Sequence, residues 1–267
     1  MRRKTMTAPD ESWLKKRGIV IRANAEDLAA AGADMFCQTA RQSVERRGFF
    51  AVAVSGGTTP RRMHRLLSRN PRLSEIPWRC THLFWVDERM LPPDQPGSNF
   101  GAARRDFLDR VPIPPGQVHP IPVTEDPEEA AARYEEDLKK FFHPTKEGFP
   151  EFDLIFLGVG KDGHTASLFP GRPGMEETGR WVTPVKGGDP EVNRVTMTYP
   201  VLNRARRVVF LISGKEKAGI VKTLFQTKEA RLPARRIRPL NGKPIWLMDR
   251  EAAFQLTGAV AGRVLGN

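Results

Sequence analysis

Cysteines and long apolar runs are both scarce in this chain of 267 residues. No stretch reaches the roughly 18 consecutive apolar residues that a membrane-spanning helix requires, so we expect no membrane segment. The two cysteines, Cys37 and Cys80, are too few for a disulfide framework, and both stand in apolar surroundings. We therefore expect reduced core cysteines in a cytoplasmic protein.

The N-terminus lacks the apolar centre of a secretory signal, although it begins with basic residues. We expect residues 1–15 to form a disordered lead, with Met6 as an alternative start. Internal repeats, low-complexity segments and long linkers are also absent. Residues 16–267 are therefore predicted to form a single domain, for which 39% hydrophobic residues supply a large core.

Acidic side chains are in deficit, since 31 Asp and Glu face 43 Lys and Arg, and the formal net charge is +12. Such a balance occurs in nucleic-acid-binding proteins, in basic proteomes and in proteins with anionic small substrates. The basic residues are scattered, with no Lys/Arg tract, no zinc-finger spacing and no aromatic RNA-binding signature. We expect no nucleic-acid partner, although a nucleic-acid binder stays the alternative that composition alone suggests.

Short apolar runs alternate with helical patterns along the chain. Strand-like runs cover 18–22, 49–54, 82–86, 152–157, 195–199, 208–212 and 245–248. Helical patterns cover 25–47 with Gly48 as its end, the segment from Pro60 to Arg69, 98–110, 127–142, a stretch from 213 or 214 to 225, and the residues after the last strand. Strands that alternate with helices predict an α/β fold with a mainly parallel sheet.

The unusual segments of the sequence all directly follow predicted strands. They are residues 55–59, 87–89, 158–164 and 213–217. In open α/β sheets the carboxyl ends of the strands form the ligand crevice. We therefore expect these four polar or glycine-rich segments to converge on one site.

The segment Ser55-Gly56-Gly57-Thr58-Thr59 stands between a buried strand and a helix. Its glycines allow close backbone approach to a ligand, and the start of the helix presents free N–H groups to an anion. It matches neither the P-loop nor the dinucleotide-binding fingerprint. A phosphate-binding loop and a tight turn both stay open as interpretations.

Three charged residues, Asp87, Glu88 and Arg89, follow the next strand. An arginine in this place can bind a phosphate through two parallel hydrogen bonds. The alternative is a cluster of salt bridges on the surface.

The richest segment is 158–164, which reads Gly-Val-Gly-Lys-Asp-Gly-His. Asp162 is close enough in sequence to His164 for its carboxylate to orient the imidazole. Histidine is the commonest general base because its ordinary pKa lies near neutrality. An isolated histidine is usually structural, but this one stands in a glycine-rich loop after a buried strand, unlike the other four.

The sequence lacks the motifs of two other kinds of hydrolytic site. The sequence has no His-x-x-x-His pair and no Cys/His cluster, so we expect no metal. It also lacks the Gly-x-Ser-x-Gly elbow that a Ser-His-Asp hydrolase would have.

Taken together, these segments resemble the 6-phosphogluconolactonase family. The resemblance runs from Ile19 to Ala253, and its order and spacing are specific even though each segment alone is weak. It rests on segments 55–60 (Ser-Gly-Gly-Thr-Thr-Pro), 85–89 (Trp-Val-Asp-Glu-Arg), 98–99 (Ser-Asn), 153–171 (the loop around His164), 194–198 (Arg-Val-Thr-Met-Thr) and 214–217 (Gly-Lys-Glu-Lys).

The resemblance implies a three-layer, Rossmann-like fold with helices on both faces of the sheet, similar to glucosamine-6-phosphate deaminase and ribose-5-phosphate isomerase. It implies hydrolysis of 6-phospho-D-glucono-1,5-lactone in the oxidative pentose phosphate pathway without a metal or organic cofactor. We expect a monomer or a homodimer. By the same resemblance His164 is the general base, and the contacts to the sugar-phosphate lactone are Ser55, Gly56, Gly57, Thr58, Thr59, Arg89, Arg194 and Lys217. We also expect Asp162 or a loop carbonyl to orient the His164 ring, and Asp87 to lie among the substrate contacts.

Two rival functions stay open. Glucosamine-6-phosphate deaminase shares the Asp-Gly-His core, but its motif has a catalytic glutamate five residues after the histidine, where this chain has Phe169. A non-catalytic sugar-phosphate binding protein is the second rival, and such proteins usually carry a DNA-binding segment for which we find no spare sequence. One departure from the family is segment 189–191, which reads Asp-Pro-Glu where many relatives have Lys-Pro-Pro.

Overall fold

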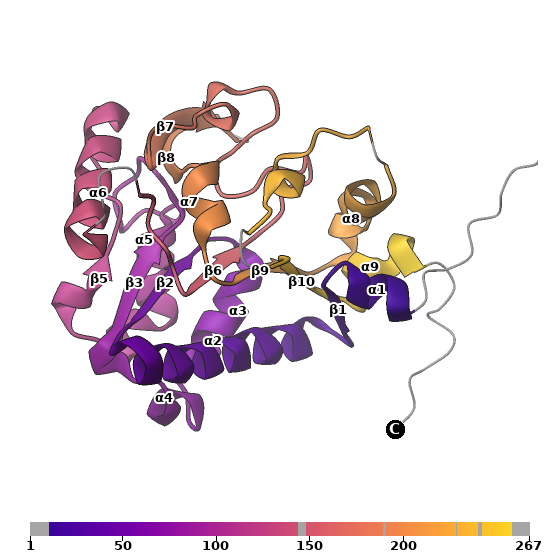
Figure 1. Ribbon diagram of the computed structural model, residues 1–267, viewed down its shortest axis with the longest axis horizontal. Coiled ribbons are helices and arrows are strands. Elements are labelled where there is room, and N and C mark those ends of the chain that lie inside the picture. Colours follow the sequence, from indigo (N-terminus) through magenta and orange to yellow (C-terminus); the bar gives the residue numbers. More distant parts are fainter. Residues whose placement is uncertain (1–10, 144–147, 189–190, 228, 240–241, 258–267) are drawn as a thin grey trace, which may run out of the picture.

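A seven-stranded sheet forms the centre of the structure, a computed structural model that describes residues 11–143, 148–188, 191–227, 229–239 and 242–257. The strand order is β1-β10-β9-β6-β2-β3-β5, and every neighbouring pair is parallel (Figure 1). The predicted α/β fold with a mainly parallel sheet is therefore confirmed. The strands of this sheet are β1 (Ile19–Arg22), β2 (Phe50–Val54), β3 (Thr81–Trp85), β5 (Val118–His119), β6 (Leu154–Leu157), β9 (Val208–Ile212) and β10 (Ile245–Asp249).

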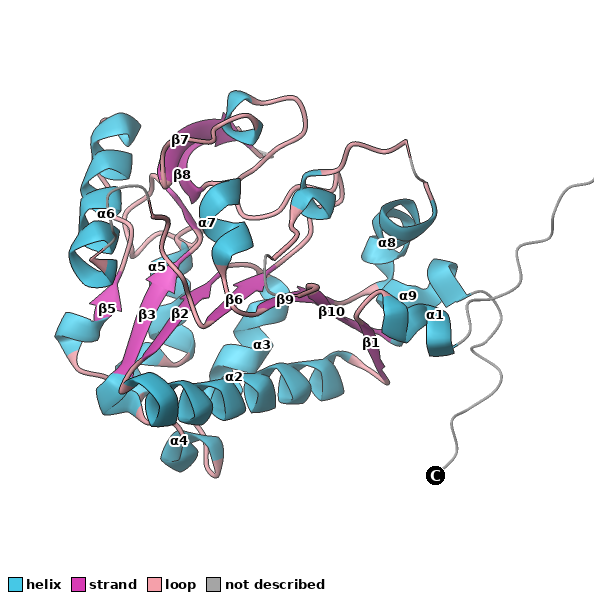
Figure 2. Cartoon of the chain, viewed as in Figure 1, coloured by secondary structure: helices cyan, strands magenta, loops and turns pink. Residues whose placement is uncertain are grey.

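Helices cover both faces of this sheet, with α2 and α3 on one side and α7 on the other (Figure 2). All residues of β2, β6 and β9 are buried, as their continuous apolar sequences predict. The α-helices are α1 (Glu11–Lys16), α2 (Ala25–Arg47), α3 (Thr58–Leu67), α4 (Arg72–Glu75), α5 (Asn99–Asp106), α6 (Pro127–Phe142), α7 (Tyr199–Arg204), α8 (Ala218–Gln226) and α9 (Arg250–Thr257). Short 3-10 turns cover Trp78–Cys80, Leu108–Arg110, Pro115–Gln117, Pro173–Met175, Lys215–Lys217 and Pro233–Arg236.

Helix α2 begins and ends at residues whose chemistry determines its boundaries. The Asn24 side chain accepts a hydrogen bond of 2.8 Å from the Asp27 N–H and thereby caps the N-terminus. Gly48 ends the helix in the left-handed conformation with φ of 81°, as predicted. Between them the alanine-rich sequence favours a helix, and buried residues such as Phe36 pack against the sheet.

A second, antiparallel sheet was not predicted. It has the order β4-β8-β7, with bounds β4 (Asp87–Arg89), β7 (Val182–Gly187) and β8 (Val192–Met197). The predicted strand 195–199 is therefore displaced, because Thr198 leaves the strand and Tyr199 begins α7 with Pro200 in its first turn. An apolar run predicts an extended segment but does not say which sheet it joins or in which direction it pairs.

Three other predicted boundaries are wrong. The helix predicted over 98–110 ends at Asp106, because Phe107 adopts φ of −155° and turns its ring into the core. The helix after β9 is preceded by the 3-10 turn Lys215–Lys217. Residues 11–15 of the predicted disordered lead lie in α1, while residues 1–10 lie outside the described part of the chain.

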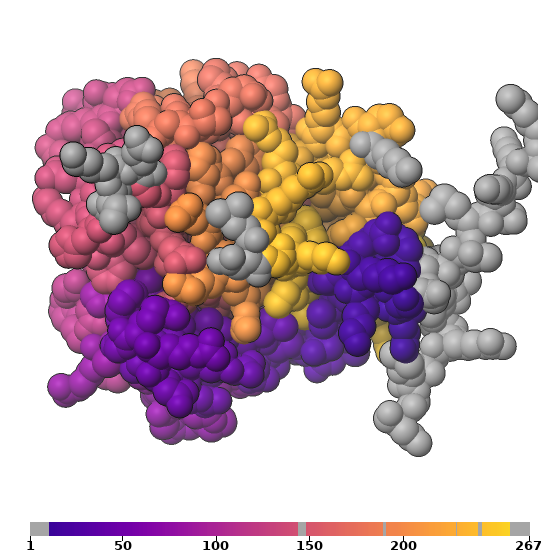
Figure 3. Space-filling model, viewed as in Figure 1, coloured from indigo at the N-terminus to yellow at the C-terminus, as the bar shows by residue number. Residues whose placement is uncertain are grey.

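One contiguous hydrophobic cluster extends through the sheet and the helices around it. Segments from opposite ends of the chain meet there, and indigo N-terminal residues lie against yellow C-terminal ones in Figure 3, as the pairing of β1 with β10 requires. Both cysteines are free, and burial raises the pKa of the Cys37 thiol to about 11. Among the helices of the described residues, none has the length and apolarity to cross a membrane.

Candidate active site

The four polar segments meet in one cavity of about 780 Å³ at the carboxyl ends of the parallel strands. The cavity lies where β2 and β6 are neighbours, with the later strands β3 and β5 on one side and β9 and β10 on the other. This reversal of strand order opens a crevice between the two loops that follow the strands. Every predicted site residue lines this cavity, namely Ser55, Gly56, Gly57, Thr58, Thr59, Asp87, Arg89, Asp162, His164, Arg194 and Lys217.

The imidazole of His164 is held by Asp162. Its Nδ1 lies 2.6 Å from Asp162 Oδ1, and the same oxygen accepts a hydrogen bond of 3.1 Å from the His164 backbone N–H. Burial opposes ionisation of the Asp162 carboxyl, but these hydrogen bonds outweigh it and lower its pKa. An ionised carboxylate only accepts hydrogen bonds, so in the neutral form of the ring Nδ1 carries the proton and Nε2 has a free lone pair.

Gly160 leaves the space in which this pair lies. A Cβ atom at Gly160 would stand 2.1 Å from His164 Nδ1 and 2.6 Å from Asp162 Oδ1, which is far inside van der Waals contact. The Gly160 N–H donates to the His164 carbonyl at 2.9 Å and closes the loop. The glycine-rich sequence therefore serves close packing around the histidine.

The loop after β2 also lines the cavity and offers hydrogen-bond donors to it. Helix α3 begins at Thr58, and its N-cap residue Gly57 supplies no side-chain hydrogen bond to the free N–H groups. Ser55 Oγ is buried and has no hydrogen-bond partner among the described residues. A helix N-terminus with free N–H groups and a hydroxyl beside it is suited to an anion.

Arg89 and Arg194 reach the cavity from the small sheet, where they are directly paired on β4 and β8. Arg89 donates to the Gly97 carbonyl at 2.8 Å and to Asn99 Oδ1 at 3.3 Å. Arg194 donates to the Gly187 carbonyl at 3.0 Å. Among the described residues neither guanidinium forms a salt bridge, so both charges remain available to an anion.

The two acidic residues before Arg89 are buried, so the alternative of a surface salt-bridge cluster is wrong. Asp87 accepts a hydrogen bond of 2.6 Å from Ser167 Oγ. Glu88 accepts the N–H groups of Asn99 and Phe100, each at 2.8 Å, and holds the start of α5 against β4. Burial raises the pKa of Glu88, although these backbone hydrogen bonds act in the opposite direction.

Lys217 enters the cavity from the 3-10 turn that follows β9. Its Nζ donates to the Val159 carbonyl at 2.7 Å, which ties this turn to the loop after β6. Burial lowers the pKa of the Lys217 ammonium, and the nearby cation Lys161 acts in the same direction. The described residues contain no group of three or more His, Cys, Asp and Glu side chains that could hold a metal ion.

Sequence reasoning gave no site role to Asn99 or Phe169, yet both line the cavity. Asn99 accepts from Arg89 and donates to the Asp87 carbonyl at 2.9 Å, and its place in the Ser98-Asn99 motif was the available signal. The Phe169 ring lies 4.6 Å from the His164 ring, and the Arg194 guanidinium carbon lies 5.3 Å from its centroid. Of the segment that departs from the family, residues 189 and 190 lie outside the described part of the chain.

The sequence matches the family of glucosamine-6-phosphate isomerases and 6-phosphogluconolactonases over residues 23–246. The chain belongs to this family. A member named 6-phosphogluconolactonase from Synechocystis is 42% identical over 83% of this chain and 92% of its own length. A rat member of the same name is 36% identical, covering 90% of this chain and 93% of its own length.

Solved structures of family members share the fold. A 6-phosphogluconolactonase from Thermotoga maritima superposes with a TM-score of 0.75 at 30% identity, covering 86% of this chain and 98% of its own. A monomeric glucosamine-6-phosphate deaminase has the same TM-score at 21% identity, covering 88% and 98% of the two chains. The expected likeness in fold to the deaminase is therefore confirmed, while the choice between the two family activities depends on the site.

Proposed function

We propose that this chain hydrolyses 6-phosphogluconolactone, a sugar-phosphate lactone. The observation that carries the proposal is the His164–Asp162 pair at 2.6 Å in a cavity that also holds two arginines, neither of which pairs with a carboxylate among the described residues. A histidine oriented by a carboxylate suits the activation of water, and paired cations suit a phosphate. The similarity to relatives named 6-phosphogluconolactonase, over 83% and 90% of this chain, supports the same activity.

Hydrolysis begins when His164 Nε2 takes a proton from a water molecule as the oxygen attacks the lactone carbonyl. Asp162 stabilises the imidazolium that forms, because its carboxylate faces the Nδ1–H. The ring C–O bond then breaks, and the imidazolium returns its proton to the leaving ring oxygen. The products are the open-chain acid and the free histidine, ready for another cycle.

The phosphate holds the lactone ring in place during these steps. Arg89, Arg194 and Lys217 supply three positive charges around the cavity, and the start of α3 supplies N–H donors. Binding energy at the phosphate is thereby used to orient the carbonyl carbon toward the activated water.

The site lacks a group that the rival activity, ring-opening deamination, requires. Its motif requires a carboxylate five residues after the histidine, and Phe169 occupies that position with only 6% of its surface exposed. A phenyl ring packed on the imidazole neither donates nor accepts a proton. A non-catalytic binding role is disfavoured by the oriented His164–Asp162 pair.

A coupled assay tests the proposal. Freshly prepared 6-phosphogluconolactone is supplied, its loss is compared with spontaneous hydrolysis, and ammonia release from glucosamine 6-phosphate is followed in parallel. We expect lactone loss well above the spontaneous rate and no ammonia. Equal loss with and without the protein would overturn the proposal.

The variant His164→Ala assigns the activity to this site, and turnover should fall about 10²- to 10⁴-fold, the usual contribution of a general base. His143→Asn is the matched control. His143 is exposed, lies outside the cavity and has φ of 45°, a conformation that asparagine tolerates. The cytoplasmic location and the monomeric or homodimeric state stay predictions.

A further inference from the structure

A second hollow, of about 280 Å³, lies at the opposite edge of the sheet from the active site. It is lined by residues that immediately precede β6 and β9 and by the last turns of α2, whereas the active site lies beyond the carboxyl ends of β6 and β9. The two cavities share no lining residue. The lining residues are Thr39, Gln42, Ser43, Arg46, Arg47, Asp153, Arg206 and Arg207.

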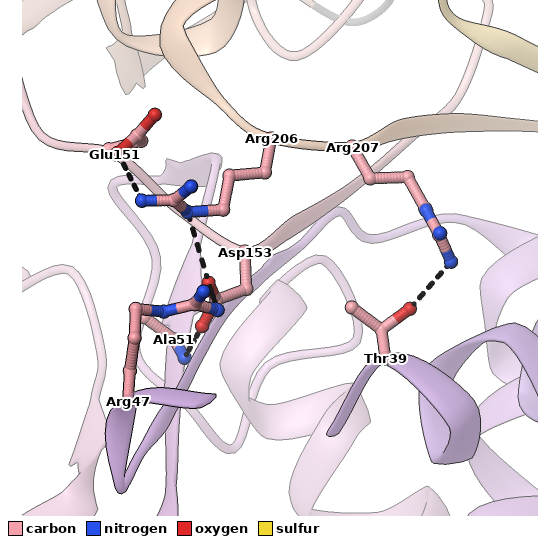
Figure 4. Close-up of polar contacts among 7 residues, drawn as sticks. All are labelled: Thr39, Arg47, Ala51, Glu151, Asp153, Arg206 and Arg207. Atoms are coloured by element: carbon pink, nitrogen blue, oxygen red, sulfur yellow. Dashed lines mark hydrogen bonds and ion pairs between the residues drawn. The ribbon is translucent and has the colours of Figure 1, made fainter. Parts of the chain in front are cut away.

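The one carboxylate in this hollow is already saturated (Figure 4). Asp153 forms an ion pair with Arg47, accepts the Ala51 N–H at 2.9 Å, and lies 3.6 Å from Arg206 Nε. Arg206 also donates to Glu151 at the rim. The charges of Arg47 and Arg206 are therefore balanced by these two acidic residues.

The charges of the other two arginines, Arg46 and Arg207, are not balanced by an acidic residue within the described part of the chain. Arg207 is half-buried, and its Nη1 donates to Thr39 Oγ1 at 3.0 Å, a neutral partner (Figure 4). Among the described residues Arg207 has no carboxylate partner, and Arg46 forms neither a hydrogen bond nor an ion pair. Two guanidinium groups thus line the hollow without a carboxylate partner among the described residues, so both can donate hydrogen bonds to an anion.

Backbone hydrogen bonds make this arrangement rigid. The Arg206 N–H donates to the Phe152 carbonyl at 2.8 Å, and the Ile155 N–H donates to the Arg207 carbonyl at 2.9 Å. Thr39 Oγ1, which accepts from Arg207, donates to the Met35 carbonyl at 2.7 Å and is thereby oriented. The Arg207 side chain is therefore positioned before any ligand arrives, so less ordering cost accompanies binding.

We propose that this hollow binds a phosphate dianion, either free phosphate or a phosphate monoester, at a site separate from the active site. The planar forks of Arg207 and Arg46 supply paired donors of the kind that phosphate oxygens accept, and the Ser43 hydroxyl and the Gln42 amide stand beside them. The volume of about 280 Å³ suits a small anion, and the Asp153 carboxylate is already paired with Arg47, Arg206 and the Ala51 N–H. The inference does not depend on the reaction carried out at the active site.

The arginine side-chain Nε–H signals in ¹⁵N NMR test this assignment, with inorganic phosphate as the probe and sodium chloride at equal ionic strength as the reference. We expect a saturable shift of the Arg207 signal with phosphate only. In Arg46→Ala the phosphate concentration at half-saturation should rise about tenfold, as the loss of one charge-assisted contact implies. Arg204→Ala is the matched control, since Arg204 is exposed, stands three residues before Arg207 in the sequence, and lies outside the hollow.

The proposal is overturned if the Arg207 signal moves no further with phosphate than with chloride, or if Arg46→Ala and Arg204→Ala weaken binding equally. Arg46 is exposed, so Arg46→Ala leaves the fold intact and any change in phosphate binding reports on the hollow itself. Glucose 6-phosphate is titrated in parallel to distinguish the two sources of the anion. If glucose 6-phosphate binds more tightly than inorganic phosphate, the natural ligand of the hollow is a phosphate monoester. If it binds equally or more weakly, the ligand is free phosphate. Lactone turnover in Arg46→Ala should stay within twofold of the unsubstituted protein, and a larger loss would contradict a separate site.

Discussion

Arg89 and Arg194 lie directly opposite each other on two antiparallel strands, and both side chains line the active-site cavity. Like charges in this cross-strand position repel each other. No carboxylate forms a salt bridge with either guanidinium among the described residues, and burial lowers the pKa of Arg194, although the Asp87 carboxylate acts in the opposite direction. A bound phosphate would relieve the repulsion, which explains why two arginines occupy a pair that is costly without a ligand.

Removing one of these arginines should weaken substrate binding more than it slows the chemical step. We expect Arg89→Gln to raise KM about tenfold, because one charge-assisted phosphate contact is lost. Steady-state kinetics with the lactone gives KM and kcat separately, and Arg104→Gln serves as the control, since Arg104 forms an exposed salt bridge away from the cavity. An unchanged KM in Arg89→Gln would remove this residue from the phosphate site.

Gly160→Ala should abolish most of the activity without unfolding the protein. The added methyl group would stand 2.1 Å from His164 Nδ1, so the imidazole and Asp162 have to separate. We expect kcat to fall at least tenfold, because a displaced general base loses its alignment. Circular dichroism checks the fold, and Gly116→Ala is the control, because a Cβ there would contact nothing within 4 Å. Normal turnover in Gly160→Ala would show that the observed His164–Asp162 contact is dispensable.

Phe169→Ala should affect both catalysis and binding, because the ring contacts His164 and Arg194 at once. Without it, both side chains gain freedom, and we expect kcat/KM to fall about tenfold, as for a modest loss of transition-state alignment. Phe169→Leu keeps an apolar side chain of similar volume and should retain more activity. If Phe169→Ala and Phe169→Leu are both fully active, the ring has no positioning role.

The stability of the protein should decrease as the pH falls below neutrality, because of a histidine outside the active site. Complete burial lowers the pKa of His64 to about 4, so the folded state keeps this ring neutral. The unfolded chain binds the proton at the ordinary pKa of about 6.5. Between pH 6.5 and 4 the unfolded state therefore holds more protons, and the free energy of unfolding drops by up to about 1.4 kcal/mol per pH unit.

Urea unfolding of the unsubstituted protein and His64→Phe across this pH range measures that contribution. The His64 ring packs against Phe107 with centroids 4.9 Å apart, so a phenyl ring is tolerated in its place. The slope of stability against pH should be smaller in His64→Phe. Identical slopes would mean that His64 titrates in the same way in both states.

The sequence by itself determined the elements that depend on local chemistry. The buried strands of the central sheet followed from continuous apolar runs, and α2 followed from its alanine content and from Gly48. The convergence of the loops followed from one rule about parallel sheets, so that all of the predicted residues line the cavity. These inferences worked because strand burial and the ends of α2 depend on residues within one short segment, and because strands that alternate with helices pair in parallel.

Only the tertiary structure decided the small sheet, and with it the pairing of Arg89 and Arg194. The three residues of β4 are charged, and β8 lies more than 100 residues further along the chain, so no periodic pattern links them. The contact of Phe169 with His164 and the hollow around Arg207 likewise depend on packing between distant segments. Such contacts arise because the whole chain buries its apolar surface in one cooperative step. The sequence of a single segment does not determine which distant segment will pack against it.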